Sequence, residues 1–373
     1  IGCAILIYEE HKKNLRSIDS IEAQPVYHDD LPLNSLPLAS LHGLHSNINP
    51  SIPPSHKHTP KNLKHELAML KKQFSLGLID RYEYISQKQE FNKLLLEFSK
   101  EIKSTDIISI DVSEESVVFK FKPFELEMET DGAARSAPFE ILNFGNYEAE
   151  DAYIIYNLIR DGDVIIDVGA NIGWYAINFA KKFPNSKIYS FEPIPDTYEY
   201  LKNNIKRNNL ENVEFFNLGL GNEDAEKVLY YFKGGSAIAS IENLINHENA
   251  KKINCVFRKL DSLALTLRLN SINFIKCDIE GCELFMLQGA SESIQKFKPI
   301  IFIEIFEEWC NKCDYRSSDI ITLLREWEYE MYEVENGGLK SINDVKPIDN
   351  GKYNYFFMHK QKHKEEIKRL QVS

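Results

Sequence analysis

The sequence predicts an α/β fold built around a doubly wound, mostly parallel sheet. Between about residues 162 and 360, short apolar runs of strand length alternate with segments of helical period. The first of these runs ends in a glycine-containing turn that leads directly into a helix. Strands that are each followed by a helix favour parallel pairing with helices on both faces of the sheet.

Five apolar runs are the expected parallel strands. They cover residues 164–168 (VIIDV), 187–192 (KIYSFE), 213–220 (VEFFNLGL), 272–279 (INFIKCDI) and 299–305 (PIIFIEI). Two later runs, 329–335 (YEMYEVE) and 354–360 (NYFFMHK), flank a polar, glycine-containing segment. We expect these two to form a terminal antiparallel pair.

The part of the chain before this alternation divides into three kinds of sequence. Residues 1–60 are rich in Pro, Ser, Asn and His without a period, which predicts an irregular or disordered lead-in. Residues 61–104 carry two amphipathic stripes and predict a helical hairpin that serves oligomerisation or docking. Residues 105–373 are the expected catalytic domain. It begins with short alternating strands over 105–145 and a helix near 149–158.

Composition excludes several classes of function. A formal charge of −12 argues against a nucleic acid partner, because phosphate binding depends on Lys and Arg. No apolar run approaches the roughly 18 to 20 residues of a membrane span. The six cysteines are few for 373 residues, so reduced thiols and a cytoplasmic location are expected. The chain starts at Ile1 without Met, so an upstream leader or domain stays open.

The turn after the first strand reads DVGANIG, from Asp167 to Gly173. Glycines let a ligand approach the backbone, and the helix that follows offers unpaired N–H groups to a carboxylate or phosphate. The second strand ends at Glu192, where an acid can accept hydrogen bonds from a ribose diol. An adenosine-containing cofactor is therefore expected. Trp174 and Asn171 stand where a dinucleotide fingerprint needs glycine, which favours S-adenosylmethionine over a nicotinamide dinucleotide.

These motifs resemble the FkbM family of S-adenosylmethionine-dependent methyltransferases. The resemblance covers roughly residues 140–335 and rests on DVGANIG, FEP, LDSL, CDIEGCE and LQGA. It implies the Rossmann-like class I methyltransferase fold, with seven strands and an antiparallel last strand. It also implies that Asp167, Gly169, Asn171 and Gly173 hold the methionine part of the cofactor and that Glu192 holds the ribose.

Acidic residues after the fourth and fifth strands are the candidates for chemistry, because ligands of open α/β sheets lie beyond the carboxyl ends of the strands. Asp278 is the first choice as general base, or else as a group that binds the methionine amine. Glu280 and Glu304 are further catalytic candidates, and Glu304 stands out as one acid inside an apolar strand. Glu283 and Ser236 are the candidate substrate contacts. Either Glu283 orients the acceptor or it stabilises a helix start.

The predicted activity is transfer of a methyl group to a hydroxyl of a sugar, glycan precursor or secondary metabolite. Two alternatives remain at this stage: methylation of a nitrogen or carboxylate by the same fold, and a non-catalytic scaffold that binds the adenosine ligand and acts through its hairpin. No metal site is predicted. Asp278 and Glu304 could hold Mg²⁺, but two carboxylates do not define such a site.

Overall fold

The computed structural model describes residues 71–73, 75–76, 98–100, 102–113, 116–130, 132, 136–231, 251–345 and 353–372. The chain divides into two units, Gly2–Leu96 and Glu97–Ser373, and the sheets and the cavity belong to the second. The predicted lead-in, residues 1–60, and most of the predicted hairpin, residues 61–104, lie outside the described residues. Their structure and the oligomerisation assigned to the hairpin therefore stay predictions.

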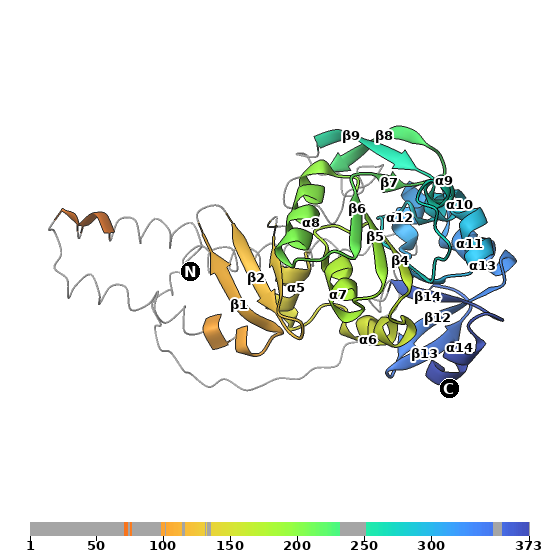
Figure 1. Cartoon of the computed structure of the whole chain (residues 1–373), viewed down its shortest axis with the longest axis horizontal. Coiled ribbons are helices and arrows are strands. Elements are labelled where there is room, and N and C mark those ends of the chain that lie inside the picture. Colours follow the sequence, from red (N-terminus) through yellow and green to blue (C-terminus); the bar gives the residue numbers. More distant parts are fainter. Residues whose placement is uncertain are drawn as a thin grey trace, which may run out of the picture. The chain divides into compact units, whose positions relative to one another are not determined.

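The main sheet confirms the predicted parallel α/β architecture. Its eight described strands lie in the order β13-β12-β14-β11-β10-β4-β5-β6 (Figure 1). All neighbours from β11 to β6 are parallel, whereas β14 is antiparallel to both β11 and β12. The bounds are β4 Val164–Val168, β5 Lys187–Phe191, β6 Val213–Phe216, β10 Phe274–Cys277, β11 Ile300–Glu304, β12 Tyr329–Glu335, β13 Gly338–Ile342 and β14 Asn354–His359.

The prediction of seven strands was one too few. The segment after β12, read as a polar connection, folds back as β13 and pairs antiparallel with β12. The reversal takes place at Asn336 and Gly337, whose φ angles are 50° and 74°. Two left-handed residues at an Asn-Gly pair are typical of the tightest hairpin turns.

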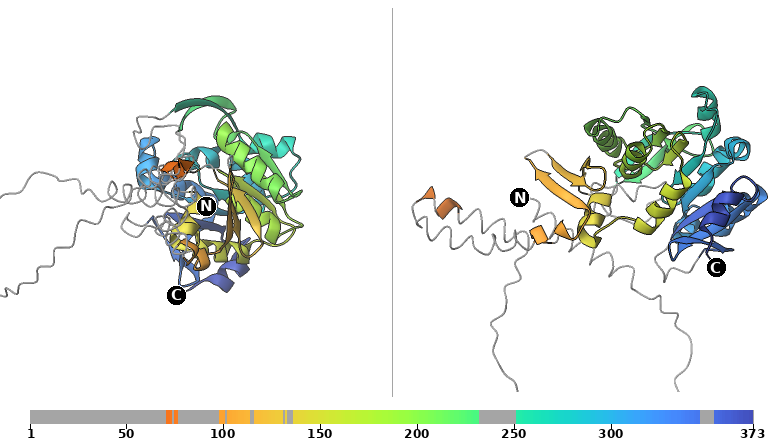
Figure 2. Two further views of the ribbon diagram at one scale, coloured as in Figure 1. Left: turned by 90° about the vertical axis from the view of Figure 1, so that its left-hand side faces the viewer. Right: turned by 60° about the horizontal axis from the view of Figure 1, so that its bottom comes forward.

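Alternate residues of the parallel strands are buried on opposite faces of the sheet, and helices lie on both sides (Figures 1 and 2). On one face, Phe274 and Phe302 contact aromatic residues of α7, Trp174–Lys182. On the other face, Ile275 and Ile303 belong to a core with residues of the later helices. Those helices are α9 Leu260–Thr266, α10 Glu283–Gly289, α11 Ser291–Phe297, α12 Glu307–Lys312 and α13 Ser317–Glu326.

The remaining helices flank the start and the end of this domain or follow the second strand. They are α5 Ala137–Phe144, α6 Ala149–Leu158, α8 Pro195–Arg207 and α14 Lys364–Leu370. The helix expected near residues 149–158 is confirmed as α6. The helix α5 was not predicted, since its residues fell within the stretch read as short strands.

Two small sheets accompany the main one. The first is the antiparallel sheet β1 Ile107–Val112, β2 Val117–Phe121 and β3 Leu126–Glu129, which confirms the strands expected after residue 105. The second contains β7 Gly219–Leu220, β8 Ala225–Tyr231 and β9 Lys251–Arg258. The predicted third strand, 213–220, is therefore two strands in different sheets. Neither β8 nor β9 was predicted.

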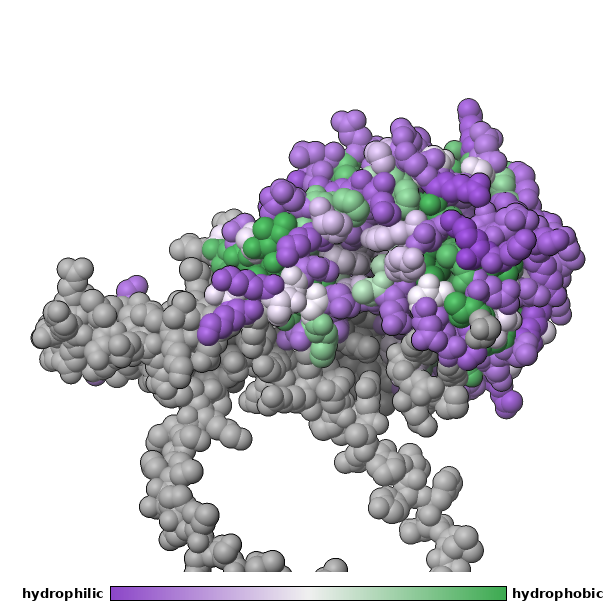
Figure 3. Space-filling model, turned by 90° about the horizontal axis from the view of Figure 1, so that it is seen from below, coloured by the Kyte–Doolittle hydropathy of each residue, from purple (hydrophilic) through white to green (hydrophobic). Residues whose placement is uncertain are grey.

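The surface agrees with the ordinary composition. Seen from below, the described residues are mostly hydrophilic, and the hydrophobic side chains occur in small groups (Figure 3). No described helix is both long enough and apolar enough to cross a bilayer. The described cysteines, Cys255, Cys277, Cys282, Cys310 and Cys313, are free thiols.

Candidate active site

A cavity of about 740 Å³ lies at the carboxyl ends of the parallel strands. Its lining includes Gly169 after β4, Glu192 after β5, Asp278 after β10 and Glu304 at the end of β11. The opposite wall comes from the connection between α5 and α6 and from the start of β14. Volumes of roughly 300 to 1,000 Å³ are usual for cofactor and small-molecule sites. The sequence therefore placed its principal candidates at one cavity.

The glycine turn is shaped by its contact with the loop after β10. Gly169 has a φ of +74°, and a Cβ atom there would lie 1.9 Å from the carbonyl oxygen of Asp278. Gly169 and Asn171 line the cavity, whereas Asp167 and Gly173 do not. Gly173 has a φ of +100° and is the N-cap of α7. Direct cofactor contacts from Asp167 and Gly173 stay predictions.

Glu192 holds the glycine turn through hydrogen bonds. Its Oε2 accepts the backbone N–H of Asn171 at 3.0 Å, and its Oε1 accepts that of Ile194 at 2.9 Å. Burial raises the pKa of Glu192 to about 7, although both hydrogen bonds act in the opposite direction. Because each carboxylate oxygen has two lone pairs, the side chain retains capacity to accept a ligand hydroxyl.

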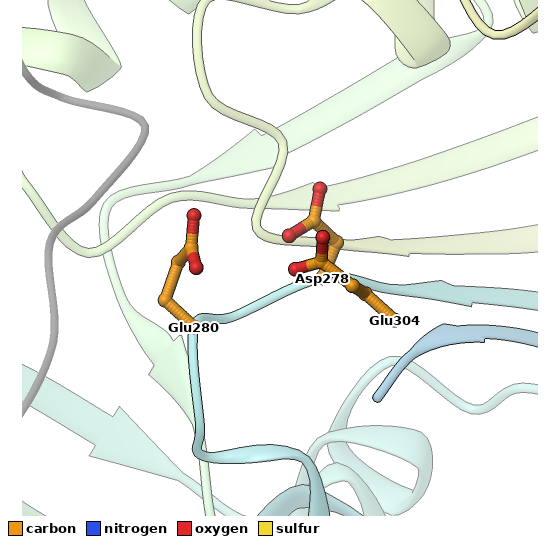
Figure 4. Close-up of side chains that lie close together, drawn as sticks. All are labelled: Asp278, Glu280 and Glu304. Atoms are coloured by element: carbon orange, nitrogen blue, oxygen red, sulfur yellow. The ribbon is translucent and has the colours of Figure 1, made fainter. Parts of the chain in front are cut away.

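The three predicted catalytic acids lie together. One oxygen from each of Asp278, Glu280 and Glu304 falls within 4.8 Å of the other two. In Figure 4 the carboxylates of Asp278 and Glu304 are adjacent, and Glu280 follows on the loop after β10. The spacing would suit a hard cation with oxygen ligands. An ammonium or hydroxyl group of a ligand would fit equally well, so the cluster by itself does not define a metal site.

Asp278 and Glu304 have different electrostatic surroundings. Burial raises the pKa of Glu304 well above its usual value, and the carboxylates of Asp278 and Glu283 raise it further. The raised pKa favours the protonated form of Glu304, which shares a hydrogen bond with Asp278. Asp278 is about one third exposed and lies 3.3 Å from the ammonium group of Lys276. Two neighbouring carboxyl groups with separated environments are a common arrangement for acid–base chemistry.

The structure describes one of the two predicted substrate residues, Glu283, and places it outside the cavity lining. Glu283 is buried and does not line the cavity. Its Oε1 accepts the N–H groups of Ile279 and Gly281, and its Oε2 accepts the hydroxyl of Tyr315. These contacts support a structural role different from the helix-start role that the sequence left open, because they shape the loop that carries Asp278 and Glu280. Ser236 lies outside the described residues, so its role stays a prediction.

Sequence reasoning missed Lys276. The side chain is 4% exposed, lines the cavity, and lies 3.9 Å from Asp167 Oδ1 as well as close to Asp278. In the sheet, Lys276 is the direct neighbour of Asp167. The available signal was a lysine inside the apolar run INFIKCDI, because a lysine is seldom fully buried unless paired.

The wall between α5 and α6 was also missed. Glu148, with a left-handed backbone, accepts hydrogen bonds from the Tyr175 hydroxyl and, at 3.1 Å, from the Asn354 side chain. Burial raises the pKa of Glu148 to about 7. The rings of Tyr147 and Trp174 meet edge to face with centroids 6.0 Å apart. This wall presents aromatic surface beside carboxylates.

The lining is strongly acidic. Among the described residues that form it, Lys276 is the one lysine or arginine, whereas the carboxylates are Glu140, Glu148, Glu150, Asp151, Glu192, Asp278, Glu280 and Glu304. A ligand carboxylate or phosphate would find no unpaired cation among these residues, so it would depend on backbone N–H groups such as those at the start of α7. Neutral or cationic groups suit this lining better.

Comparison with known proteins agrees with the motifs. The model of the methyltransferase FkbM domain matches residues 167–331. Methyltransferase 1 of Beauveria bassiana is 29% identical over 149 residues, which are 35% of this chain and 60% of that protein. Methyltransferase sdnD of Sordaria araneosa is 27% identical over 186 residues, 42% of this chain and 71% of that protein.

A third relative has a named substrate class. The hexuronic acid methyltransferase AglP of Haloferax volcanii is 28% identical over 142 residues, 38% of this chain and 56% of that protein. The chain thus spans between about half and three quarters of these three relatives. The domain match begins at the glycine turn and extends to β12, so it includes the second and fourth strand ends that line the cavity. Residues 167–331 therefore match the FkbM methyltransferase domain, in agreement with the family that the motifs predicted.

Proposed function

We propose that this protein is an S-adenosylmethionine-dependent O-methyltransferase that acts on a hydroxyl of a sugar, a glycan precursor or a secondary metabolite. The observation that carries the proposal is the convergence of the glycine turn, Glu192 and the Asp278 loop on one cavity inside an FkbM domain. The Haloferax volcanii relative, which is by name a hexuronic acid methyltransferase, supports the choice of a carbohydrate class.

The residues present fit the cofactor. Gly169 and Asn171 bring the turn before α7 to the cavity, and the carboxylate of Glu192 lines the cavity one strand away. In this assignment, the turn holds the methionine part and Glu192 holds the ribose hydroxyls. When bound, the cofactor supplies a sulfonium methyl group that is open to in-line displacement.

The protein's part in the reaction is to orient the acceptor and to take its proton. The Asp278 carboxylate receives the hydroxyl proton as the acceptor oxygen forms its bond to carbon and the sulfur–carbon bond breaks. Glu304, whose protonated form burial favours, hydrogen-bonds Asp278 and helps to hold that carboxylate in place. Glu280 orients a second hydroxyl. Orientation can contribute up to roughly 7 to 11 kcal/mol, and a base adds about 10² to 10⁴ in rate.

The acidic lining distinguishes between acceptor classes. A carboxylate acceptor would be repelled by the acids around it, which disfavours carboxyl methylation. A neutral polyhydroxyl compound can donate hydrogen bonds to several of these acids. An amine would also be attracted, so nitrogen methylation is the second candidate. The scaffold alternative is disfavoured because the glycine turn, Glu192 and Asp278 are all in place at the cavity.

The test separates cofactor binding from turnover. S-adenosylhomocysteine affinity is measured by calorimetry, and transfer of labelled methyl groups is measured on a panel of neutral sugars, amino sugars and uronic acids. Glu192→Ala should weaken S-adenosylhomocysteine by about tenfold or more. Asp278→Asn should retain that affinity within about threefold and lose about 10² to 10⁴ in methyl transfer.

Each variant can overturn its own assignment. Unchanged affinity in Glu192→Ala would remove the ribose role, and full turnover in Asp278→Asn would remove the base role. Lost affinity in Asp278→Asn would instead support its alternative role at the methionine amine. Methyl transfer to the nitrogen of amino sugars, with none to a sugar hydroxyl, would contradict the acceptor class.

A further inference from the structure

Lys276 is a buried lysine in the middle of the main sheet, and the proposed chemistry gives it no role. Its strand, β10, lies between β4 and β11, and its side chain is 4% exposed. Removing an ammonium group from water is costly unless charges and acceptors surround it. The groups around its Nζ atom therefore indicate what the residue does.

The partners of Lys276 belong to two places. The Nζ atom donates to the carbonyl oxygen of Gly169 at 3.0 Å and lies 3.3 Å from Asp278 Oδ2. Both of these residues line the cavity. The third partner, Asp167 Oδ1 at 3.9 Å, is fully buried and does not line it. The lysine thus has one partner in the sheet interior and two at the site.

The charge state of Lys276 limits its chemistry. Burial acts to lower its pKa, but the carboxylates of Asp278 and Asp167 outweigh burial, and the pKa lies above its usual value. The ammonium group consequently keeps its proton and cannot serve as a base. It acts as a hydrogen-bond donor and as a counter-charge.

The two site partners of Lys276 come from turns that touch each other. The backbone N–H of Asp278 donates to the Val168 carbonyl at 3.2 Å. The absence of a side chain at Gly169 is what allows the Asp278 carbonyl to approach. Lys276 adds a charged link between the same two turns, one assigned to the cofactor and the other carrying the base.

We propose that Lys276 is a positioning residue of the methyl-transfer site, whose ammonium group fixes the Gly169 carbonyl and the Asp278 carboxylate relative to each other. The inference rests on the proposed function, because it takes these two groups as cofactor and acceptor contacts. Without the ammonium group, neither the Gly169 carbonyl nor the Asp278 carboxylate is held. The cofactor turn and the base are then no longer fixed relative to each other.

A purely structural role would work through Asp167 instead. Asp167 is 0% exposed, whereas the Asp278 side chain is 34% exposed and can be solvated by water. Removal of Lys276 therefore leaves a destabilising uncompensated charge mainly at Asp167. Replacing Asp167 by Asn in the same chain removes that charge. The two roles can thus be separated by a double variant.

The experiment compares the wild type, Lys276→Met and Lys276→Met/Asp167→Asn by urea unfolding and by calorimetry with S-adenosylhomocysteine. Lys276→Met should lose both stability and affinity. The double variant should recover most of the stability, while its affinity stays weaker by about tenfold or more than that of the wild type and of the single variant Asp167→Asn, which is measured beside it because Asp167 is itself a predicted cofactor contact. Lys340→Met, which removes a half-buried lysine paired with Glu335 away from the cavity lining, is the matched control and should change neither.

The outcomes are distinct. Recovery of wild-type affinity in the double variant would overturn the positioning role and leave Lys276 as a counter-charge for Asp167. A wild-type protein that does not bind S-adenosylhomocysteine would overturn the proposed function itself. If the double variant does not fold, Lys276→Gln/Asp167→Asn, whose two amides can hydrogen-bond each other, takes its place with the same two outcomes.

Discussion

Gly169 shows how one residue joins the binding turn to the acid loop. Its backbone is left-handed, and the carbonyl oxygen of Asp278 occupies the space that a Cβ atom would need. The expected reason for glycine was close approach by a ligand. The structure adds a second reason, which is contact between two loops of the protein.

We predict that Gly169→Ala has a large effect on stability and binding and that Gly337→Ala has a small one. Both glycines have a φ of +74°, but nothing lies within 4 Å of a Cβ atom at Gly337. Gly337→Ala should lower the free energy of unfolding only by the cost of a left-handed backbone at alanine, about 1 kcal/mol. Gly169→Ala should cost several-fold more stability and abolish S-adenosylhomocysteine binding, as measured by urea unfolding and calorimetry. Equal costs would contradict the loop contact.

Charged residues in apolar strands are the site signal that the sequence carries most directly. Glu304 was found by this argument, and it lies at the cavity beside Asp278. Applied to Lys276, the same argument would have found the lysine too. The pairing of Lys276 with Asp167 was not predictable, because it depends on the register between β10 and β4. Register is set by the packing of the whole sheet.

At the scale of elements, α8 connects the first small sheet to the cofactor turn. Asn204 and Asn208 lie one helical turn apart, and each side chain hydrogen-bonds the backbone N–H and carbonyl of a β3 residue, Glu129 and Glu127 respectively. The two side-chain amides thus make the hydrogen bonds to the free edge of β3 that a neighbouring strand would make. Asn204 also donates to the carbonyl of Ile172 in the glycine turn at 2.9 Å.

Because only Asn204 also contacts the glycine turn, substitutions at the two asparagines should affect cofactor binding differently. Asn204→Ala and Asn208→Ala should each lower the free energy of unfolding by about 1 to 3 kcal/mol, because backbone groups of β3 lose their partners. Only Asn204→Ala should also weaken S-adenosylhomocysteine binding. Urea unfolding and calorimetry on both variants provide the comparison. Equal affinities in the two variants would show that the link to Ile172 does not matter for the turn.

Elements with a strong period were predictable, and short ones were not. The parallel strands and α6 follow from apolar runs and helical spacing. β7 has two residues and exists only because Gly219 and Leu220 pair with β9, a contact made far along the chain. The cavity wall between α5 and α6 was missed for the same reason. Its residues become a wall only when β14 brings Asn354 to Glu148.

At the scale of the whole molecule, acids dominate both the composition and the cavity. The chain carries 56 acidic and 44 basic residues. Burial raises the pKa of Glu148, Glu192 and Glu283 to about 7 and that of Asp167 to about 6. In the folded state these groups keep their protons up to about pH 6 to 7. In the unfolded chain they release them near the ordinary pKa values of Asp and Glu.

Stability should therefore fall as the pH rises. Each of these acids has a higher pKa in the folded state than in the unfolded chain, so the folded state binds more protons at pH values between the two. Its contribution to the free energy of unfolding is therefore complete below about pH 4.5 and is lost by about pH 7. The free energy of unfolding in urea should decrease from pH 5 to pH 7.5. Glu283→Gln should flatten this dependence by up to about 3 kcal/mol.

An exposed acid provides the control for this dependence. Glu226 lies on β8 with an exposed side chain, and Glu226→Gln removes one negative charge without removing a buried carboxyl group. It should leave the pH dependence as in the wild type. A rise in stability between pH 5 and pH 7.5 in the wild type would contradict the assignment of protonated buried acids.

The central claim is that a sulfonium nucleoside binds between the glycine turn and Glu192. The most direct measurement is calorimetry of the purified chain with S-adenosylmethionine, S-adenosylhomocysteine and a nicotinamide dinucleotide. We predict saturable binding of the first two and none of the third. Binding of the dinucleotide together with no heat from either sulfur compound would contradict the account.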